Sequence, residues 1–384
     1  MDVNHASPKI VIVGNPYAPI GRGVVALNFF RAMKEVNLPI HICDISSKLY
    51  NNNPIVEKEI SENQINQPGD YLNIYVINAD EIESSKQFIG DCPSNSYNII
   101  YPAWELSRYP EEWISKFNKF NEVWVPSSFM RDPLINLLDI PVTKISHPVE
   151  VKLKSFFDRK YFNLPENTYL FLFFFDFRSY IDRKNPFAFI EAFEYVLSQN
   201  NFSDCNVVIK INGAGFSDET KEKFANFIEK INKSVAKNKV ILLDFEMNEN
   251  EVKNLIRCCD CFVSLHRSEG FGLGIAEAMY LGKPVIATNY SGNVDFMNAE
   301  NSFLVDYKLI PVLEGQYPHF RDQVWADVNI PHAGYFMNKL QENPKYGTEI
   351  GDKARLSIKI NLSYLSIGLK IKTRILEIMK NQNG

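Results

Sequence analysis

Short apolar runs alternate with stretches of helical spacing along most of the chain. In the first half, the runs stand at 9–14, 40–45, 71–78, 98–101 and 122–125. In the second half, they stand at 169–175, 206–212, 240–244, 262–265 and 285–288. Short continuous apolar runs are typical of strands that are covered on both faces, and their alternation with helices favours parallel sheets. The pattern therefore predicts an α/β protein with two successive parallel sheets.

The two sets of runs are separated by an extended segment at His147-Pro148, where the proline disfavours a helical residue before it. The chain has 384 residues with 45% hydrophobic and 23% charged positions, which is enough for two globular domains. We therefore place a boundary near residue 150. The sequence predicts an N-terminal Rossmann-like domain over 1–150 and a C-terminal Rossmann-like domain over 151–361.

Charge and cysteine usage narrow the class of protein. A net charge of -5 argues against a protein that coats nucleic acid, because such a protein carries a basic surface. The six cysteines form no spaced disulfide framework, and no signal-peptide pattern precedes the first apolar run. No apolar run approaches the roughly 18 residues of a membrane span. We expect a cytoplasmic protein.

The most informative stretch is 261–295, which reads as a strand, a Gly-rich loop, a helix and a second strand. Gly270 and Gly272 let the backbone approach a ligand, and Phe271 lies between them. A helix that begins at Leu273 points free N–H groups and the positive end of its dipole at this loop. The stretch predicts a site for an anion such as a phosphate.

Two carboxylates flank this predicted site, Glu269 and Glu277. A carboxylate is a poor ligand for phosphate but a good acceptor for paired hydroxyls, so one suits a sugar and the other a ribose. Together with the phosphate site they indicate recognition of a nucleotide sugar. The alternative is an ordinary αβ unit, with Glu269 favoured near a helix N-terminus and Glu277 on a solvated face.

A second candidate group follows the apolar run at 169–175. The loop 176–186 carries three cations, Arg178, Arg183 and Lys184, at the carboxyl end of a predicted strand. Arginine offers a planar fork and lysine a mobile point charge, and together they could neutralise a diphosphate. Taken alone, such a loop is usually only solvated.

Two further features lie in the first half. Glu105 follows the strand at 98–101, at the carboxyl edge where α/β sheets bind ligands, and could bind an acceptor or handle a proton. Residues 21–26 read G-x-G-x-x-A, and Asp44 lies at a distance that suits a dinucleotide fold. That hypothesis, an NAD-dependent enzyme, is weakened because Gly21 stands seven positions after Gly14, where the strand ends.

Residues 268–288, with Glu269 and Glu277 eight positions apart, resemble the E-x7-E signature of retaining glycosyltransferases of family 4. The resemblance implies a GT-B fold, with two Rossmann-like domains facing across a cleft. It also implies site roles. Glu269 and the backbone from Gly270 to Leu273 would hold the donor sugar, and Glu277 the ribose.

By the same resemblance, Arg178 and Lys184 would bind the donor diphosphate, and Gly21 and Gly23 would contact it from a loop of the first domain. Asn185 departs from the glycine that is commoner after this lysine. The catalytic group would then be Glu269, Arg178, Lys184 and Glu105. The leaving diphosphate would need no metal, since no Asp-x-Asp motif stands at a strand end.

The reaction implied is transfer of a hexosyl group, with retention, from a UDP- or GDP-sugar to a hydroxyl of a glycan or lipid-linked glycan, as in surface polysaccharide biosynthesis. No cofactor is expected. The alternatives are a non-catalytic sugar-nucleotide-binding protein and the NAD-dependent enzyme that would use the Gly21-Gly23 loop.

The segment from Lys353 onward is rich in lysine and arginine, with leucine, isoleucine and tyrosine interleaved. It predicts one or two basic amphipathic helices. By analogy with similar enzymes, a helix over about 362–384 would pack back on the first domain with its basic face in water. Contact with an anionic membrane surface is the alternative.

Overall fold

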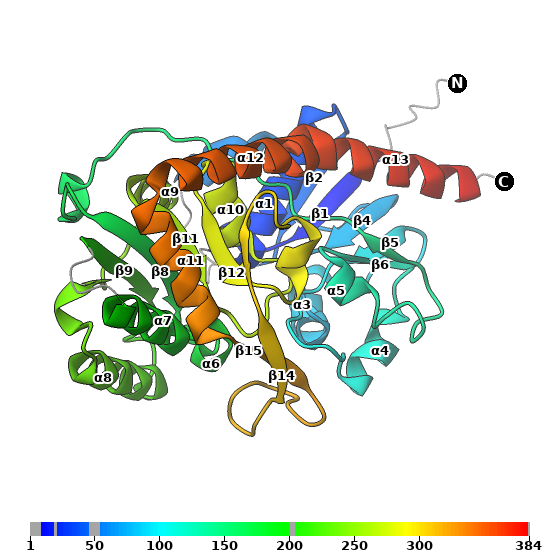
Figure 1. The fold of residues 1–384 in the computed structure, drawn as a ribbon. Coiled ribbons are helices and arrows are strands. Elements are labelled where there is room, and N and C mark those ends of the chain that lie inside the picture. Colours follow the sequence, from blue (N-terminus) through cyan, green and yellow to red (C-terminus); the bar gives the residue numbers. More distant parts are fainter. Residues whose placement is uncertain (1–8, 19–20, 46–53, 200–203, 383–384) are drawn as a thin grey trace, which may run out of the picture. The chain divides into compact units, whose positions relative to one another are not determined.

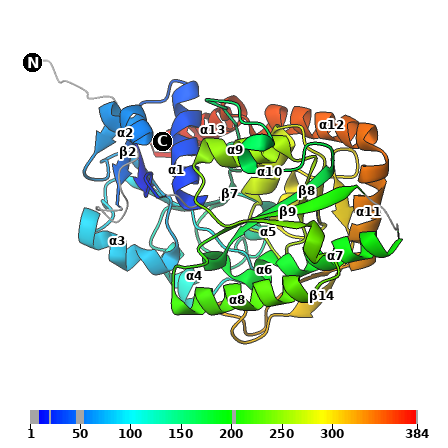
Figure 2. The ribbon, with the colours of Figure 1, turned by 90° about the vertical axis from the view of Figure 1, so that its left-hand side faces the viewer.

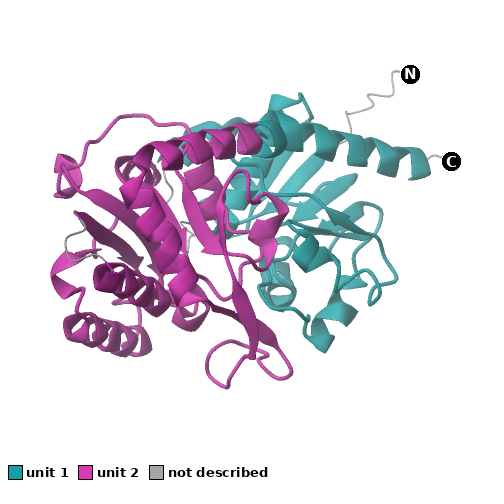
Figure 3. Ribbon diagram, viewed as in Figure 1, with its two compact units in different colours: residues 1–149, 360–384 teal, residues 150–359 magenta. Residues whose placement is uncertain are grey.

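The computed structural model describes residues 9–18, 21–45, 54–199 and 204–382 (Figure 1). The chain divides into two compact units, which Figure 3 colours separately. Unit 1 comprises residues 1–149 and 360–384, and unit 2 comprises residues 150–359. The sequence placed the change of domain near residue 150.

Unit 1 contains a seven-stranded sheet in the order β3-β2-β1-β4-β5-β6-β7, and every neighbouring pair is parallel. Its strands are β1 Ile10–Gly14, β2 Ile40–Asp44, β3 Gln64–Ile65, β4 Leu72–Tyr75, β5 Tyr97–Ile100, β6 Glu122–Val125 and β7 Val142–Lys144. Its α-helices are α1 Gly21–Glu35, α2 Pro54–Ile60, α3 Ile82–Ile89, α4 Glu111–Phe117, α5 Ser128–Arg131 and α13 Tyr364–Gln382. This is the predicted Rossmann-like arrangement.

The start of α1 corrects one expectation from the sequence. Gly21 and Gly23 were expected in a loop of the first domain, but the helix α1 begins at Gly21. A Cβ on Gly23 would overlap the backbone oxygen of Ala18, whereas one on Gly21 would meet open space. Gly23 therefore lets the preceding loop pack against the first turn of α1.

The helix α13 packs on α1 within unit 1. A Cβ on Gly368 would overlap the backbone oxygen of Ala32, so glycine brings the two helices close together. The Tyr364 hydroxyl donates to Asn28 Oδ1 at 3.0 Å. Helix α13 thereby completes the domain that α1 begins.

An ion pair fixes α13 to β6. Glu122 on β6 is fully buried, and Arg374 of α13 donates to it from Nε at 3.0 Å and from Nη2 at 3.1 Å. The Tyr97 hydroxyl and the Trp124 indole also donate to this carboxylate. A buried carboxylate is tolerated when a cation and hydrogen bonds compensate it, as they do here.

Unit 2 contains a six-stranded parallel sheet in the order β10-β9-β8-β11-β12-β13. Its strands are β8 Tyr169–Asp176, β9 Cys205–Asn212, β10 Val240–Leu243, β11 Cys261–Ser264, β12 Val285–Thr288 and β13 Phe303–Val305. Its α-helices are α6 Ile181–Lys184, α7 Pro186–Gln199, α8 Asp218–Lys233, α9 Glu249–Cys258, α10 Leu273–Tyr280, α11 Ile330–Glu342 and α12 Pro344–Leu362. Figure 2 shows β8 and β9 between α9 and α10 on one side and α7 and α8 on the other.

The aromatic run of β8 supplies both faces of this sheet. Phe171, Phe173 and Phe175 belong to the core cluster that also contains the inner residues of α7. Phe174 points the other way, and a Cβ on Gly274 of α10 would lie only 2.7 Å from its ring. Because successive side chains of a strand alternate between faces, one phenylalanine run covers both.

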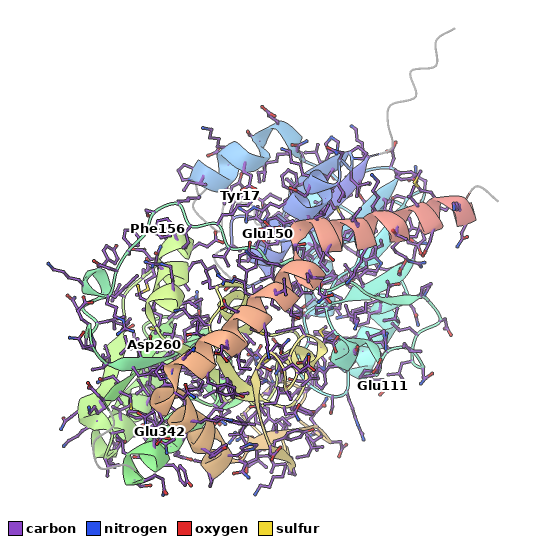
Figure 4. The ribbon with its side chains drawn as sticks, turned by 45° about the horizontal axis from the view of Figure 1, so that its top comes forward. Tyr17, Glu111, Glu150, Phe156, Asp260 and Glu342 are labelled. Carbon is purple, nitrogen blue, oxygen red and sulfur yellow. The ribbon has the colours of Figure 1, made fainter. Side chains whose placement is uncertain are left out.

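Two segments of unit 2 lie outside the regular alternation. After β13 the chain forms an antiparallel hairpin of β14 Tyr307–Pro311 and β15 Val324–Val328, which the sequence pattern left unassigned. The segment that opens unit 2 is held on α9, where Asn254 donates from Nδ2 to the Ser155 carbonyl at 2.8 Å. Figure 4 labels Phe156 on that segment.

The Glu122–Arg374 pair predicts a large effect on stability. In Arg374→Met the buried Glu122 carboxylate loses its cation, so we expect the free energy of unfolding to fall by about 3 kcal/mol. Urea denaturation followed by tryptophan fluorescence reports this, because Trp104, Trp113 and Trp124 all lie in unit 1.

Two controls separate this buried pair from a general effect of losing an arginine. Glu122→Gln combined with Arg374→Met removes both charges and should recover most of the loss. Arg131→Met breaks the exposed pair with Asp132 and should cost less than about 1 kcal/mol. Equal losses in Arg374→Met and Arg131→Met would contradict the anchoring role.

Candidate functional site

Three loops meet at one edge of the unit 2 sheet. They follow β8, β11 and β12, which are neighbouring parallel strands, so their carboxyl ends lie side by side. The loop after β8 carries the cations, and the loop after β11 carries the Gly-rich stretch. This edge therefore brings together the two candidate groups that the sequence placed about 85 residues apart.

Glu269 is the point where the first two loops join. Lys184 Nζ lies 2.5 Å from Glu269 Oε1, and Arg183 Nη1 lies 3.2 Å from Glu269 Oε2. The side chain of Glu269 is only 13% exposed. Its two carboxylate oxygens thus each face a different cation.

The electrostatics of this cluster keep Glu269 ionised. Burial raises the pKa of its carboxyl, but the charges of Lys184 and Arg183 outweigh that effect and lower the pKa to about 2. At neutral pH the group therefore accepts hydrogen bonds and does not donate a proton. That suits it to hold hydroxyl groups and makes it a poor general acid.

Arg183 is one of the three cations of the loop 176–186, but only Arg178 and Lys184 were given a role from the sequence. Its side chain is almost fully buried, and Nη1 also donates to the Ser268 carbonyl at 3.0 Å. Its own carbonyl accepts from Arg267 N at 2.8 Å. Its position directly before Lys184 was the available signal, but spacing does not show which way a side chain on the single turn of α6 points.

Arg178 occupies a different position on the same edge. Its guanidinium makes a two-point contact with Asp176, from Nε to Oδ1 at 2.8 Å and from Nη2 to Oδ2 at 2.5 Å. It also lies over the ring of Phe216, with 5.6 Å to the ring centroid. The predicted pair of Arg178 and Lys184 thus consists of one cation held by Asp176 and one held by Glu269.

The conformation of Asn185 explains why asparagine can stand where glycine is commoner. Its φ is 54°, in the left-handed region that favours glycine and that asparagine tolerates. Its side chain donates from Nδ2 to the Leu265 carbonyl at 3.0 Å. Asparagine therefore makes the turn after Lys184 and adds a bond to the loop after β11, which glycine cannot do.

The Gly-rich loop depends on close backbone approaches. Gly272 has a φ of 93° at the start of α10, and a Cβ on Gly292 would overlap the Gly270 carbonyl oxygen. The first helical hydrogen bond of α10 runs from Ala276 N to Gly272 O. The N–H groups of residues 273–275 consequently make no helical bond, which leaves donors for an anion.

Buried polar groups hold the Gly-rich loop in position through hydrogen bonds. His266 is fully buried between Ser264 and Asn293, with 3.1 Å from Nδ1 to Ser264 Oγ and 3.1 Å from Nε2 to Asn293 Oδ1. Burial lowers the pKa of His266, so its imidazole is neutral at pH 7. Ser291 Oγ accepts from Glu269 N at 2.8 Å. Neither His266 nor Ser291 was expected at the site from the sequence.

The hydroxyl group of Ser268, next to Glu269 in the chain, is an unsatisfied polar group. Its side chain is fully buried, and its Oγ has no hydrogen-bond partner among the described residues. Buried hydroxyls are seldom left unpaired, so such an atom beside a candidate binding loop favours a ligand contact.

Glu277 is buried on α10 and forms an ion pair with Lys253 of α9. The alternative that placed Glu277 on a solvated face is therefore wrong. Both side chains of the pair are about nine-tenths buried. A ribose that bound here would meet a carboxylate whose position is fixed by a neighbouring lysine.

The β14–β15 hairpin contacts the loops that follow β8 and β11. Ala326 N donates to the Arg267 carbonyl at 3.0 Å, and the Arg267 guanidinium lies over the Trp325 ring at 5.3 Å. Tyr317, between the two strands, packs its ring 4.6 Å from that of Tyr180. The hairpin thus contacts both loops that supply Lys184 and Glu269.

The remaining predicted residues belong to unit 1. Glu105 is partly buried just beyond β5, at the carboxyl edge of that sheet. Burial, together with the nearby Glu105 charge, raises the pKa of Tyr109. Gly21 and Gly23 lie in the first turn of α1, as described above.

Part of the chain is similar in sequence to known proteins. Residues 155–310 match the family model described as Glycosyl transferases group 1. A segment of 125 residues is 31% identical to a UDP-Gal:alpha-D-GlcNAc-diphosphoundecaprenol alpha-1,3-galactosyltransferase of Escherichia coli. That alignment covers 32% of this chain and 30% of the relative, so the match spans less than a third of either protein.

Two solved structures resemble the whole fold or most of it. HepE of Anabaena in complex with UDP-glucose has a TM-score of 0.68 at 14% identity, covering 96% of this chain and 99% of that chain. A point mutant of TarM from S. aureus, in complex with UDP and other ligands, has a TM-score of 0.56 at 20% identity, covering 78% of this chain and 55% of that chain. The predicted fold class, two Rossmann-like domains of the GT-B type, is confirmed.

The low pKa of Glu269 predicts a dependence of stability on pH. Its folded pKa of about 2 lies below the ordinary value of 4.5, so the ionised cluster stabilises the fold above about pH 4.5. That contribution, of about 3 kcal/mol, should be lost progressively as the pH falls toward 2.

Acid denaturation of the parent and of Glu269→Gln measures this contribution. Other carboxyl groups titrate equally in both proteins, so the difference between the two curves isolates Glu269. The parent should lose more stability than the variant between pH 4.5 and pH 2. Parallel curves through that window would contradict the assigned cluster.

Proposed function

We propose that the chain is a retaining glycosyltransferase of family 4, which transfers a hexosyl group from a nucleotide diphosphate sugar to an acceptor hydroxyl. The observation that carries the proposal is the cluster of Lys184, Arg183 and Glu269 beside the start of α10. This cluster lies inside the segment that matches Glycosyl transferases group 1.

The diphosphate has two kinds of partner here. The N–H groups at the start of α10 and the helix dipole favour an anion, and the Lys184 ammonium lies at the same edge of the sheet. A phosphate that approaches Lys184 competes with Glu269 for it. Arg178, on the loop that also carries Lys184, adds a second cation for the diphosphate.

The sugar hydroxyls are assigned to Glu269 and the ribose hydroxyls to Glu277. Glu269 stays ionised because its pKa is about 2, so it accepts hydrogen bonds from hydroxyl groups. The orphaned Ser268 hydroxyl is buried beside it and is a further candidate contact.

In the transfer step, the bond between the anomeric carbon and the β-phosphate oxygen breaks, and a bond from the acceptor oxygen to that carbon forms. The acceptor proton passes to the departing phosphate. Lys184, Arg178 and the α10 N-terminus stabilise the negative charge that develops on the diphosphate, so the step is metal-independent. Glu105 is proposed to contact the acceptor.

The relatives suggest a donor and a class of acceptor. The Escherichia coli relative is named for UDP-Gal and a diphosphoundecaprenol acceptor, and HepE was solved with UDP-glucose. We therefore propose a UDP-hexose donor and a lipid-linked glycan acceptor, in cytoplasmic synthesis of a surface polysaccharide precursor.

A binding and hydrolysis screen tests this function. The melting temperature of the purified parent protein and its hydrolysis of UDP-, GDP- and ADP-hexoses are measured in the presence of EDTA. One donor should raise the melting temperature and be slowly hydrolysed. Lys184→Met should lower turnover by about 100-fold or more, because it removes a charge that stabilises the leaving group. Glu277→Ala should mainly weaken donor binding.

Lys221→Met is the matched control, since Lys221 is an exposed lysine of α8 in the same unit, and it should behave as the parent. Binding without hydrolysis or transfer would indicate a non-catalytic nucleotide-sugar-binding protein. A melting shift with NAD alone, lost in Gly21→Val, would replace the proposal by the dinucleotide hypothesis. Activity that requires a divalent cation would refute metal independence.

A further inference from the structure

The short helix that carries Arg183 and Lys184 begins after a strained residue. Tyr180 directly precedes α6 and has a φ of 60° and a ψ of 96°. Glycine adopts such a backbone conformation freely, whereas a tyrosine is strained in it. Strain of this kind persists only where neighbouring contacts hold the residue, and it is commonest at functional sites. The contacts that hold Tyr180 are therefore of interest.

The backbone of Tyr180 sets the direction of α6. Its carbonyl oxygen accepts from Arg183 N at 3.1 Å and from Lys184 N at 3.3 Å. Helix α6 is a single turn of four residues, and one turn is not stable by itself. A change in the dihedral angles of Tyr180 would therefore move both cations relative to Glu269.

The β14–β15 hairpin lies beside α6 (Figure 1) and supplies contacts that hold its start. Tyr317, in the hairpin loop 312–323, is only 7% exposed, and its ring lies 4.6 Å from that of Tyr180. The neighbouring Gln316 donates from Nε2 to Asp182 Oδ1 at 3.4 Å. The hairpin loop thus contacts the first residues of the turn, immediately before the two cations.

The hairpin loop is itself held in a defined conformation. Leu313 N donates to Gln316 Oε1 at 2.9 Å, and Gln316 N donates to the Leu313 carbonyl at 3.2 Å. Val312 N donates to the carbonyl of the buried Gln323 at 2.9 Å, which closes the loop at its base. Trp325, next on β15, is fully buried. A loop fixed in this way can hold a neighbouring residue in a strained conformation.

We propose that Tyr317 is a positioning residue for the transfer reaction: it holds Tyr180 in its strained conformation, and Tyr180 in turn directs Lys184 toward the donor diphosphate. The inference rests on the proposed function, in which Lys184 stabilises the charge that develops on the leaving diphosphate. That charge is largest in the transition state. A displaced Lys184 should therefore lower kcat more than it weakens donor binding.

Two substitutions of Tyr180 test the role of its backbone. Tyr180→Gly and Tyr180→Ala both remove the ring, but only glycine adopts a φ of 60° without strain. Tyr180 is 39% exposed, so neither change opens the core. Tyr180→Gly should keep the arrangement of the site, whereas Tyr180→Ala and Tyr317→Ala should lose it. Tyr317→Phe keeps the packed ring and should retain the arrangement.

The first readout needs no donor. Acid denaturation of each variant, with and without Glu269→Gln, isolates the stability that the ionised Glu269 contributes above pH 4.5 and loses toward pH 2. In Tyr317→Ala and Tyr180→Ala this contribution should fall to about half or less, because the two cations no longer hold the carboxylate. In Tyr180→Gly and Tyr317→Phe it should equal that of the parent.

Tyr169→Ala is the matched control for the loss of a packed tyrosine. Tyr169 belongs to the same unit, at the opposite end of β8 from the site, and its ring lies 4.9 Å from that of Phe171. The substitution should lower stability at every pH and leave the contribution of Glu269 unchanged. An equal fall of that contribution in Tyr169→Ala and Tyr317→Ala would overturn the proposal.

The second readout is the hydrolysis of UDP-glucose and UDP-galactose. In Tyr317→Ala, kcat should fall about tenfold, while KM for the sugar nucleotide should change less than about threefold. Parent-like acid curves in Tyr317→Ala, or equal losses in Tyr180→Gly and Tyr180→Ala, would refute the positioning role. If the parent hydrolyses neither sugar nucleotide, the proposed donors are wrong, and the acid curves alone decide whether Tyr317 positions the cations.

Discussion

The ionised carboxylate of Glu269 is the constraint on which the candidate site depends. A buried carboxylate is costly unless cations and hydrogen bonds compensate it, and here Lys184 and Arg183 come from one loop while Glu269 comes from another. Neither loop can move without leaving a charge uncompensated. Arg183 also holds the Ser268 carbonyl, and Asn185 holds that of Leu265, so the same few residues fix both loops over several positions. The result is a preorganised cation beside a helix N-terminus.

This arrangement explains why glycines recur at the edge of the sheet. Gly272 takes a left-handed conformation to begin α10, and Gly292 brings the loop after β12 against Gly270. The contact between Gly292 and Gly270 is between backbones, so a side chain on Gly292 would separate the loops. Gly274 lets α10 sit on the Phe174 ring, which sets the height of the helix N-terminus over the sheet. Packing in the core and binding at the edge are therefore coupled through one short helix.

Much of this could be predicted from the sequence, and the limits have physical causes. The strands were found because buried parallel strands are continuous apolar runs, and Glu269 and Lys184 because motifs and strand ends identify loops. The sequence could not show which charged side chain pairs with which. Arg178 and Arg183 are equivalent in spacing arguments, and only the turn of α6 points Arg183 at Glu269. The hairpin at 307–328 was not predicted, because its exposed strand β14 has no apolar run. The start of α1 was placed too far along the chain, because Gly21 and Gly23 are typical loop residues.

Helix α13 is fixed on unit 1 by two independent contacts. Its inner face is specified by Gly368 against α1 and by Arg374 on the buried Glu122, so its orientation on unit 1 is fixed. Because the Glu122 carboxylate needs the arginine as its cation, α13 cannot leave the sheet without leaving a buried charge uncompensated. The last helix of the chain is therefore part of the first domain in energetic terms as well as in position.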